Sequence, residues 1–422
     1  MIIKEISEIV YNDFALTHPL LSSYQLVGWG NLKEAYGWKK HLIGFYENNN
    51  LKGVTLLLEK KLKIFKSIYY APRGFLIDFN DLQLLKKITS ELKIYLKKNR
   101  GIMLKIDPNV VYAFRNSDGE IISKPNDSLV DYLKVLGYKH LGFNKEFETM
   151  QPRFLCRYEI IDNDYEKTFN SFSKSTKKNT LKVYENGVCV RKGTSDDINL
   201  FCEMENKTAI RKGMVTRPNS YYKKMYESIK DYSEIYLSYI DTQIFLDNIL
   251  LKIENEKKAH AEIVLKMQKE KVGDNLKNQL DLSNQRSKKL LEEKVLAKDL
   301  ISKGDKIYIG SLYALYIGEE GITFTSGIDN DYRKFNPKYA MYDEHLKETI
   351  RRHKKYVNFY GISGNFDKNS ENYKIYELKK GYNPTVVELI GEFDLIISKF
   401  LFRLYTTTFS IYKKTKKLKK KS

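Results

Sequence analysis

The sequence predicts a mixed α/β protein of two similar units, with a long helical arm inserted in the second. Short strand-like apolar runs alternate with amphipathic helical stretches in both halves of the chain, and a proline-free segment rich in Lys, Glu and Leu interrupts the second series. The length of 422 residues also exceeds one ordinary domain. The expected parts are a first unit over 1–152, a second over 153–244 and 303–392, the arm over 245–302 and a tail over 393–422.

The first unit is predicted from strands and helices of ordinary length. His41–Glu47 and Lys52–Leu58 are strand-like runs joined by Asn48-Asn49-Asn50, a composition typical of a hairpin turn. Leu82–Lys98 is predicted as an amphipathic helix, because apolar residues recur on one face of it. The other elements expected here are strands at Ser67–Tyr70 and Ile102–Ile106 and a helix at Val130–Leu136.

The second unit shows a similar alternation, without a visible sequence repeat. Its expected strands are Phe154–Ile161, Val188–Lys192, Ser233–Ile240, Lys306–Ile317, Gly321–Thr325, Tyr356–Tyr360 and Thr385–Leu389. Its expected helices are Glu166–Tyr184, Ile198–Lys207, Tyr221–Ile229 and Ala340–His353. The similar order of elements indicates that the two units have related folds.

The arm is predicted as an antiparallel coiled-coil hairpin with its turn at Gly273-Asp274-Asn275. Its inward positions alternate spacings of four and three residues, so each helix would hold roughly 27 residues and extend about 40 Å. These positions include Lys, His and Ser, and we therefore expect the arm to be only marginally stable alone. The predicted inward positions are Leu246, Leu250, Ile253, Lys257, His260, Val264 and Met267, then Leu276, Leu280, Ser283, Ser287, Leu290, Lys294, Ala297 and Ile301.

The tail combines an apolar helical pattern with a run of lysines. Phe393–Tyr412 carries Leu395, Phe400 and Leu404 beside Arg403, which predicts an amphipathic helix. The segment 413–421 that follows is almost entirely lysine. Such a run is compatible with a solvated tail, and after an apolar helix it also fits attachment to an anionic membrane surface.

Net charge is the strongest compositional signal. A formal charge of +20 and a pI near 9.4 indicate a polyanionic partner, namely nucleic acid, an anionic membrane surface or a phosphorylated substrate, unless the chain is simply lysine-rich. No apolar stretch approaches the roughly 18 residues of a membrane span, and Met1–Glu5 lacks signal-peptide features. Cys156, Cys189 and Cys202 are expected to be reduced thiols of a cytosolic protein.

Several catalytic motifs are absent from the sequence. It contains no GxxxxGK[ST] phosphate loop, no GxGxxG after a strand, and no HExxH, CxxC or GxSxG. The turns Pro72-Arg73-Gly74 and Asp107-Pro108-Asn109 do not supply the glycine-containing pyrophosphate loop of a coenzyme A site. Metal-dependent, nucleotide-hydrolysing and serine-hydrolase classes therefore have no support, and no cofactor is expected.

A set of short phrases occurs in a characteristic order along the chain. They are Trp29–Lys33, Gly37–Lys39, Tyr70–Gly74, Lys105–Pro108, Ser173–Asn179, Arg211–Gly213, Arg217–Tyr222, Asn358–Gly361, Leu378–Tyr382 and Glu388–Asp394. In this order they resemble the Fem-type aminoacyltransferases of Gram-positive bacteria, the non-ribosomal peptidyltransferases that build peptidoglycan branches. The resemblance covers nearly the whole chain, including the arm.

The resemblance implies two domains similar to the GNAT acetyltransferase fold, with the helical hairpin inserted in the second. It implies that an aminoacyl-tRNA donates alanine, serine or glycine to the side-chain amine of residue three of the stem peptide, or to an existing branch, on lipid II or a related precursor. Because the ester is already activated, the chemistry requires only deprotonation of the amine and stabilisation of an oxyanion. Both substrates are polyanions, which fits the net charge.

The resemblance also assigns catalytic candidates. Lys379 falls on the lysine of the family's phenylalanine-lysine-x-glycine phrase, where a cation would stabilise the oxyanion at the reacting carbonyl. Leu378 replaces the usual phenylalanine, so Lys380 is the alternative register. Asp107 matches an acidic position beside the stem peptide, and it would bind the acceptor amine or accept its proton.

Further residues are implied to bind substrate. Lys33, Arg217 and Tyr221 match positions that hold the diphosphate and sugar of the acceptor, and Arg73 belongs to a matching phrase. Lys177 or Lys178 stands where the family commonly has arginine, which keeps the charge but loses the bidentate fork.

Each assignment has a structural alternative. Lys33 and Lys379 would be solvated in most proteins, Asp107 would end a strand before a turn, and Arg217–Ser220 would begin a helix. The alternative functions are a non-catalytic tRNA-binding coiled-coil protein and an acyltransferase that uses coenzyme A. For the arm, contact with tRNA and binding of a protein partner or a second copy stand equal, and the oligomeric state is left open.

Overall fold

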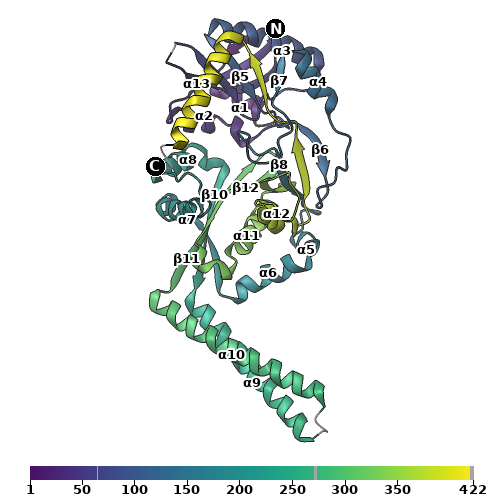
Figure 1. Ribbon diagram of the computed structural model, residues 1–422, viewed down its shortest axis with the longest axis vertical. Helices are drawn as coiled ribbons and strands as arrows, with labels where there is room; N and C mark the ends of the chain where they lie inside the picture. Colours follow the sequence, from purple (N-terminus) through teal and green to yellow (C-terminus); the bar gives the residue numbers. More distant parts are fainter. Residues whose placement is uncertain (64, 270–272, 419–422) are drawn as a thin grey trace.

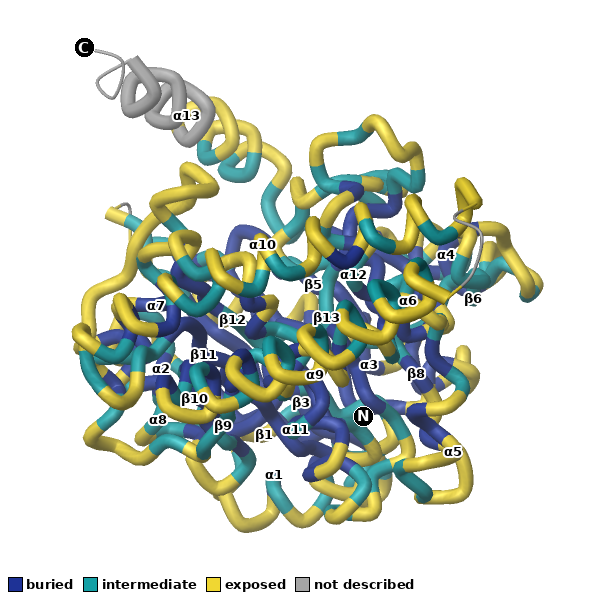
Figure 2. Tube along the Cα trace, turned by 90° about the horizontal axis from the view of Figure 1, so that it is seen from below, coloured by how far each residue is buried: buried dark blue, intermediate teal, exposed yellow. Residues whose placement is uncertain are grey.

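The structure is a computed structural model that describes residues 1–63, 65–269 and 273–418, with side chains described up to residue 408 in the last helix. It contains two sheets flanked by helices, and the arm projects from the second sheet at the bottom of Figure 1. Buried residues follow the strands of both sheets, whereas the helices of the arm are largely exposed (Figure 2).

The first sheet has seven strands in the order β1-β2-β3-β4-β5-β15-β7. Its strands are β1 (Ile2–Glu5), β2 (Lys39–Glu47), β3 (Asn50–Lys61), β4 (Ser67–Ala71), β5 (Gly101–Ile106), β15 (Phe393–Ile396) and β7 (Tyr138–His140). The helices of this half are α1 (Glu8–Ala15), α2 (Val27–Glu34), α3 (Leu82–Lys98) and α4 (Asp127–Val135).

Local sequence explains the predicted elements of this half. Asn48 and Asn49 adopt positive φ angles in the two-residue turn between β2 and β3, a conformation that asparagine tolerates well. Asp81 caps α3 by accepting a hydrogen bond from the Leu84 backbone N–H, and two lysines stand in the last turn of the helix. The apolar face of α3 packs into the core as its periodicity predicts.

The second sheet has eight strands in the order β6-β14-β8-β13-β12-β11-β10-β9. Its strands are β6 (Val111–Arg115), β14 (Thr385–Leu389), β8 (Phe154–Glu159), β13 (Tyr356–Ile362), β12 (Glu320–Ile328), β11 (Lys306–Ile317), β10 (Ser233–Asp241) and β9 (Val188–Gly193). The helices of this half are α5 (Tyr165–Asn170), α6 (Lys174–Glu185), α7 (Ile198–Arg211), α8 (Asn219–Ile229), α11 (Pro337–Arg351) and α12 (Tyr373–Lys380).

The two sheets share one pairing pattern over seven strands. In each, three antiparallel pairs lead to one parallel pair, β4–β5 or β12–β13, and two antiparallel pairs follow. This common order confirms two GNAT-like units in an α/β fold. The strands are exchanged across the boundaries predicted at residues 152 and 393, because β6 joins the second sheet and β15 joins the first.

The parallel pair differs between the two units. β4 and β5 pair along their whole length, whereas β12 and β13 pair only at Glu320–Ile322 with Tyr356–Asn358. Both strands continue for several residues beyond this point, and β13 has an irregularity between Asn358 and Gly361. The second sheet therefore opens toward the carboxyl ends of β12 and β13, where ligands bind in many α/β proteins.

Two predicted helices are corrected by the structure. The single helix expected over Glu166–Tyr184 is wrong, because Ser173 interrupts it and caps α6 through a hydrogen bond from the Thr176 backbone N–H to its Oγ. The helix expected from Phe393 is also wrong at its start. Phe393–Ile396 forms β15 in the middle of the first sheet, and α13 (Lys399–Leu418) begins only after it.

The arm consists of α9 (Thr242–Lys269) and α10 (Asp274–Lys303), as predicted. Most predicted inward positions are confirmed, but Leu250 is 40% exposed and Ile249 is only 1% exposed. Lys257 is likewise exposed, and Glu256 takes the inward place to bind Ser283 and Arg286. The predicted spacing of four then three residues and the opposite spacing of three then four share Leu246, Ile253 and His260. The burial of Ile249 shows that α9 follows the second spacing.

Within the described residues, no helix is both long and apolar enough to cross a membrane. The lysine run predicted at 413–421 lies outside the residues whose side chains the structure describes.

Candidate functional site

Lys33, Arg217 and Tyr221 form one cationic group where α2 meets α8. The Lys33 ammonium lies 4.4 Å from the centroid of the Trp29 ring, and the Arg217 guanidinium lies 4.3 Å from that of Tyr221. Burial, together with the charge of Arg217, lowers the pKa of Lys33 to about 8. Two neighbouring cations, of which one lowers the pKa of the other, form a site suited to an anion such as a diphosphate.

Close packing positions this cationic group. A Cβ atom on Gly28 would lie 1.9 Å from the Ser228 carbonyl oxygen, so α2 and α8 approach as closely as they do only because this residue is glycine. Asn206 on α7 fixes the backbone of Arg217, since its Oδ1 accepts from the Arg217 N–H and its Nδ2 donates to the Arg217 carbonyl. The guanidinium is therefore held by its main chain and by the Tyr221 ring.

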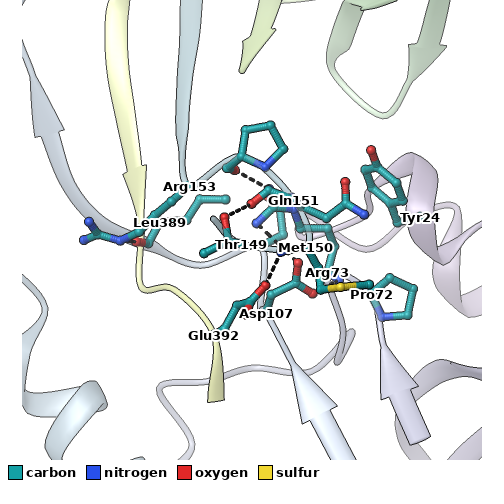
Figure 3. Close-up of polar contacts among 12 residues, drawn as sticks. Tyr24, Pro72, Arg73, Asp107, Thr149, Met150, Gln151, Arg153, Leu389 and Glu392 are labelled. Atoms are coloured by element: carbon teal, nitrogen blue, oxygen red, sulfur yellow. Dashed lines mark hydrogen bonds and ion pairs between the residues drawn. The ribbon is translucent and has the colours of Figure 1, made fainter. Parts of the chain in front are cut away.

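Asp107 and Arg73 form a second polar group at the end of β5 (Figure 3). Asp107 is 2% exposed, and its Oδ1 accepts from the Arg73 backbone N–H while its Oδ2 accepts from the Tyr70 hydroxyl. The Arg73 guanidinium donates to the Pro152 carbonyl at 2.5 Å. Burial raises the pKa of Asp107 to about 6 despite the charge of Arg73. Both carboxylate oxygens are thus already engaged, one by the turn that carries Arg73 and the other by Tyr70 of β4. Arg73 has a positive φ angle in this turn.

A cavity of about 570 Å³ lies beside this second group, between the 16–24 segment of the first half and one face of the second sheet. Its walls carry side chains of both charges and several hydroxyl groups, as a peptide ligand would require. Polar residues that line it include Tyr24, Arg73, Arg157, Glu320, Asn358 and Tyr360. Neither the Lys33 group nor Lys379 is part of this lining.

Lys379 lies at the open end of the second sheet. It is 7% exposed, and its Nζ donates a hydrogen bond to the Gly361 carbonyl at 2.8 Å. Burial lowers its pKa to about 8, with Lys212 contributing. Lys380 instead points outward and pairs with Asp118 at 2.6 Å. Of the two registers that the sequence allows, only the one with Lys379 directs a lysine into the protein.

An aromatic row connects these groups. Trp29 packs edge-on against Tyr24, Phe324 of β12 contacts both rings, and Tyr360 of β13 packs against Phe324 and is hydrogen-bonded to the Tyr24 hydroxyl. Trp29 carries Lys33 at one end, and at the other end Tyr360 precedes Gly361, whose carbonyl holds Lys379. The row therefore runs from the Lys33 group, along the cavity, to the buried lysine.

Tyr360 is a residue that sequence reasoning missed. It has a φ angle of 63° at the irregularity of β13, and Asn358 Oδ1 accepts a hydrogen bond from its backbone N–H. Such a conformation is costly for a non-glycine residue and occurs often at functional sites. The phrase Asn358–Gly361 is part of the family resemblance, but the residue types in it do not predict a positive φ angle at Tyr360. Asn206 and Tyr24 were missed because their contacts, with Arg217 and Tyr360, join residues distant in sequence.

Lys177 and Lys178 are not brought to this site. Both lie in the first turns of α6, where Lys177 donates to the Asn170 carbonyl and Lys178 is exposed. Within the described residues, neither side chain contacts Lys379 or the Lys33 group. The amino end of α6 does pack against Gly381, since the Gly381 carbonyl accepts from the Ser173 N–H.

Comparisons with known proteins agree with this architecture. The sequence pattern of the FemAB family matches residues 6–409. Aminoacyltransferase FemA of Staphylococcus epidermidis is 32% identical over 412 residues, 94% of either chain, and that of Staphylococcus aureus is 30% identical over 409 residues, 94% of this chain and 95% of that protein. The crystal structure of FemX aligns with a TM-score of 0.75 at 24% identity, over 96% of this chain and 99% of that one.

Two GNAT-like units, one opened beside a buried lysine, form the framework of an acyltransferase. The chain belongs to the FemAB family. The predicted resemblance and the predicted enzyme class, an aminoacyltransferase, are thereby confirmed.

Proposed function

We propose that this enzyme transfers alanine, serine or glycine from aminoacyl-tRNA to an amine of the lipid II stem peptide and so builds the peptidoglycan interpeptide bridge. The acceptor amine belongs to the position-three lysine or to a branch residue already added. The observation that carries the proposal is the aromatic row, which connects an anion-binding group to a buried lysine along a peptide-sized cavity.

The acceptor side is the Lys33 group and the adjoining cavity. Lys33 and Arg217 supply two cations for the diphosphate, and the Tyr221 ring supplies a face for the sugar. The stem peptide then extends into the cavity, where Arg73 and Arg157 meet carboxylates and Asn358 meets amides.

The donor side is Lys379. The acceptor amine attacks the ester carbonyl, a C–N bond forms, and the carbonyl oxygen becomes an oxyanion that the Lys379 ammonium stabilises. Collapse of the intermediate breaks the ester C–O bond, and the ribose oxygen leaves with a proton that originates from the amine. Because the donor is an activated ester, the residues on either side need only to position the reactants and stabilise charge.

Asp107 supports this chemistry in one of three ways. It binds the acceptor amine, it accepts the proton of that amine, or it positions Arg73. Its raised pKa of about 6 suits proton transfer, and its hydrogen bonds to the Arg73 turn suit positioning. Lys177 and Lys178 contribute positive charge for the body of the tRNA, outside the reaction centre.

The proposed location is the cytoplasm, at the inner face of the membrane where lipid II is assembled. Phe400 and Leu404 of α13 are exposed apolar residues beside Lys399 and Arg403, a combination that favours an anionic lipid surface. The lysines after position 412 add to this attraction.

A transfer assay tests the proposal. Lipid II bearing lysine at position three is mixed with enzyme and tRNA charged with labelled alanine, serine or glycine, and label is counted in the lipid fraction. We expect transfer from one donor, a loss of about 100-fold or more in Lys379→Ala, and nearly full activity in Lys380→Ala, the matched outward lysine.

Other outcomes select among the alternatives. Transfer only to lipid II that already carries one added residue identifies an enzyme for a later position. Absence of transfer with both acceptors, combined with tight tRNA binding, would replace the proposal by the non-catalytic tRNA-binding alternative. Equal activity of Lys379→Ala and the wild type would remove Lys379 from the mechanism.

A further inference from the structure

Three lysines gather at the opening of the second sheet without a matching set of acids. Lys379 lies at the carboxyl end of β13 through its bond to Gly361, and Lys338 stands in the first turn of α11, which follows β12. Lys212 follows α7 directly. Because β12 and β13 are parallel, their carboxyl ends lie at the same edge of the sheet.

The docking of α7 places Lys212 at this edge. Gly327 of β12 meets the backbone of Met204 and Glu205, and the Thr208 hydroxyl exchanges hydrogen bonds with the backbone of Ile328, the last residue of β12. Lys212 stands one helical turn beyond Thr208, and therefore just past the end of the strand.

The positive charge at this edge is not neutralised by the protein. The ammonium groups of Lys212 and Lys338 make no hydrogen bond or ion pair with any described residue. Glu205 is the neighbouring acid, and burial raises its pKa to about 7, so it carries at most one negative charge against three lysines. Burial and the charges of Lys212 and Lys379 lower the pKa of Lys338 to about 8.

The amino end of α11 adds to this field. Its first residue, Pro337, has no N–H, and the Tyr339 N–H donates to the Asn336 carbonyl. Because Asn336 makes no side-chain capping hydrogen bond, the backbone N–H of Lys338 has no partner among the described residues, at the positive end of the helix dipole. Exposure also follows a gradient, with Lys212 at the surface, Lys338 half-buried and Lys379 buried. The arrangement fits a ligand whose anionic group binds near the surface, at Lys212 and Lys338, while its uncharged end reaches inward to Lys379.

We propose that Lys212 and Lys338, with the amino end of α11, bind the phosphodiester that precedes the 3′-terminal nucleoside of an RNA donor and so deliver its ester to Lys379. The inference rests on the proposed function and adds the residues that recognise the donor. A phosphodiester is the anionic group nearest to the ester in such a donor. Coenzyme A would bring phosphate to the same place, so the test includes it.

A thermodynamic cycle on a minimal donor tests the inference. The dinucleotide CpA carries alanine, serine or glycine in turn through a stable 3′-amide, and its linkage is either the natural phosphodiester or a neutral methylphosphonate. We expect wild-type enzyme to bind the phosphodiester about tenfold more tightly than the methylphosphonate. Lys212→Gln with Lys338→Gln should bind both forms equally, and Lys86→Gln, an exposed lysine on α3, should behave as wild type.

The outcomes separate this inference from the proposed function. If the double variant still prefers the phosphodiester tenfold, or if the wild type shows no preference while it transfers amino acid to lipid II, the inference is wrong and the function stands. If coenzyme A displaces the dinucleotide and no RNA-dependent transfer occurs, the RNA donor is wrong. Thermal melting of the double variant should equal or exceed that of wild type, because removal of two repelling charges costs no contact.

Discussion

Lys379 and Lys380 are adjacent lysines whose environments differ completely. Lys379 is buried against the Gly361 carbonyl with a pKa of about 8, whereas Lys380 is exposed in an ion pair with Asp118. Lys212 and Lys338 on neighbouring elements, and Cys156 beneath, complete the surroundings of Lys379. A lysine with a pKa of about 8 is a cation over only part of the working pH range. Its proposed role should therefore appear in the pH dependence of transfer.

The pH dependence of transfer should report on Lys379. The protonated form stabilises the oxyanion, so in the wild type kcat/KM should fall as pH rises through about 8, against the gain from deprotonation of the acceptor amine. In Lys379→Arg the guanidinium stays charged, and the rate should continue to rise to pH 9.5. Rates at pH 6.5–9.5, corrected for donor hydrolysis, measure this; identical profiles for both enzymes would contradict the role.

Lys33 should affect binding of the acceptor rather than the chemical step. Lys33→Gln removes one of two cations from the proposed diphosphate site, so the KM for lipid II should rise about tenfold with kcat little changed. A stem peptide without the diphosphate should bind wild type and variant alike, and Lys39→Gln, an exposed neighbour, serves as control. An equal rise for the peptide alone would show that Lys33 acts through the fold instead.

At the scale of elements, the arm is attached to the second unit by a small apolar base. Phe245, Ile249, Ala297 and Leu300 are buried there with residues of the sheet and of α11, and the Thr242 hydroxyl donates to the Gly304 carbonyl where the hairpin closes. Beyond this base the inward positions include the network of His260, Ser283 and Glu256, which favours a unique register over stability.

Shortening the arm should leave the fold intact and separate its two proposed roles. Replacement of residues 255–288 by a short glycine-containing turn keeps the buried base, so the melting temperature should change by only a few degrees. If the arm contacts tRNA, the KM for aminoacyl-tRNA should rise at least tenfold, while the affinity for the CpA amide analogue stays unchanged. Unchanged use of whole tRNA would instead assign the arm to a protein partner or a second copy, which light scattering detects.

At the scale of the whole molecule, the two units are interlocked by strand exchange. β15 from the end of the chain lies between β5 and β7 of the first sheet, and β6 from the first half lies at the edge of the second. The cavity and the aromatic row both take residues from the two halves. Folding of one unit therefore depends on chain that belongs in sequence to the other.

Two truncations should distinguish the strand from the helix that follows it. Removal of residues 399–422 deletes α13 and the lysine run, so the protein should fold normally but lose salt-sensitive binding to vesicles containing anionic lipid. Removal from Phe393 onward also deletes β15, whose Phe393 and Leu395 are fully buried, and should cost at least ~4 kcal/mol of folding stability. Thermal denaturation and vesicle sedimentation check both; equal stability of the two truncations would contradict the interlocked fold.

Periodic local patterns and short phrases were sufficient to predict much of this protein. The hairpin at Asn48-Asn49, the amphipathic α3 and the two helices of the arm depend on neighbouring residues alone, and all were predicted. The family resemblance is likewise available from the sequence alone, because the order of the short phrases carries it. The resemblance also implies that Lys33, Arg217 and Tyr221 bind one part of the acceptor, and the structure brings these three residues together.

Other features were decided only by tertiary structure. Burial of Ile249 chose the register of the arm, pairing with β5 and β7 made a strand of Phe393–Ile396, and the Gly361 carbonyl distinguished Lys379 from Lys380. The three-lysine opening likewise joins the ends of α7, α11 and α12, which are far apart in sequence. The physical reason is common to all of them: burial and charge at a residue depend on side chains brought near by the fold, and no local pattern records those neighbours.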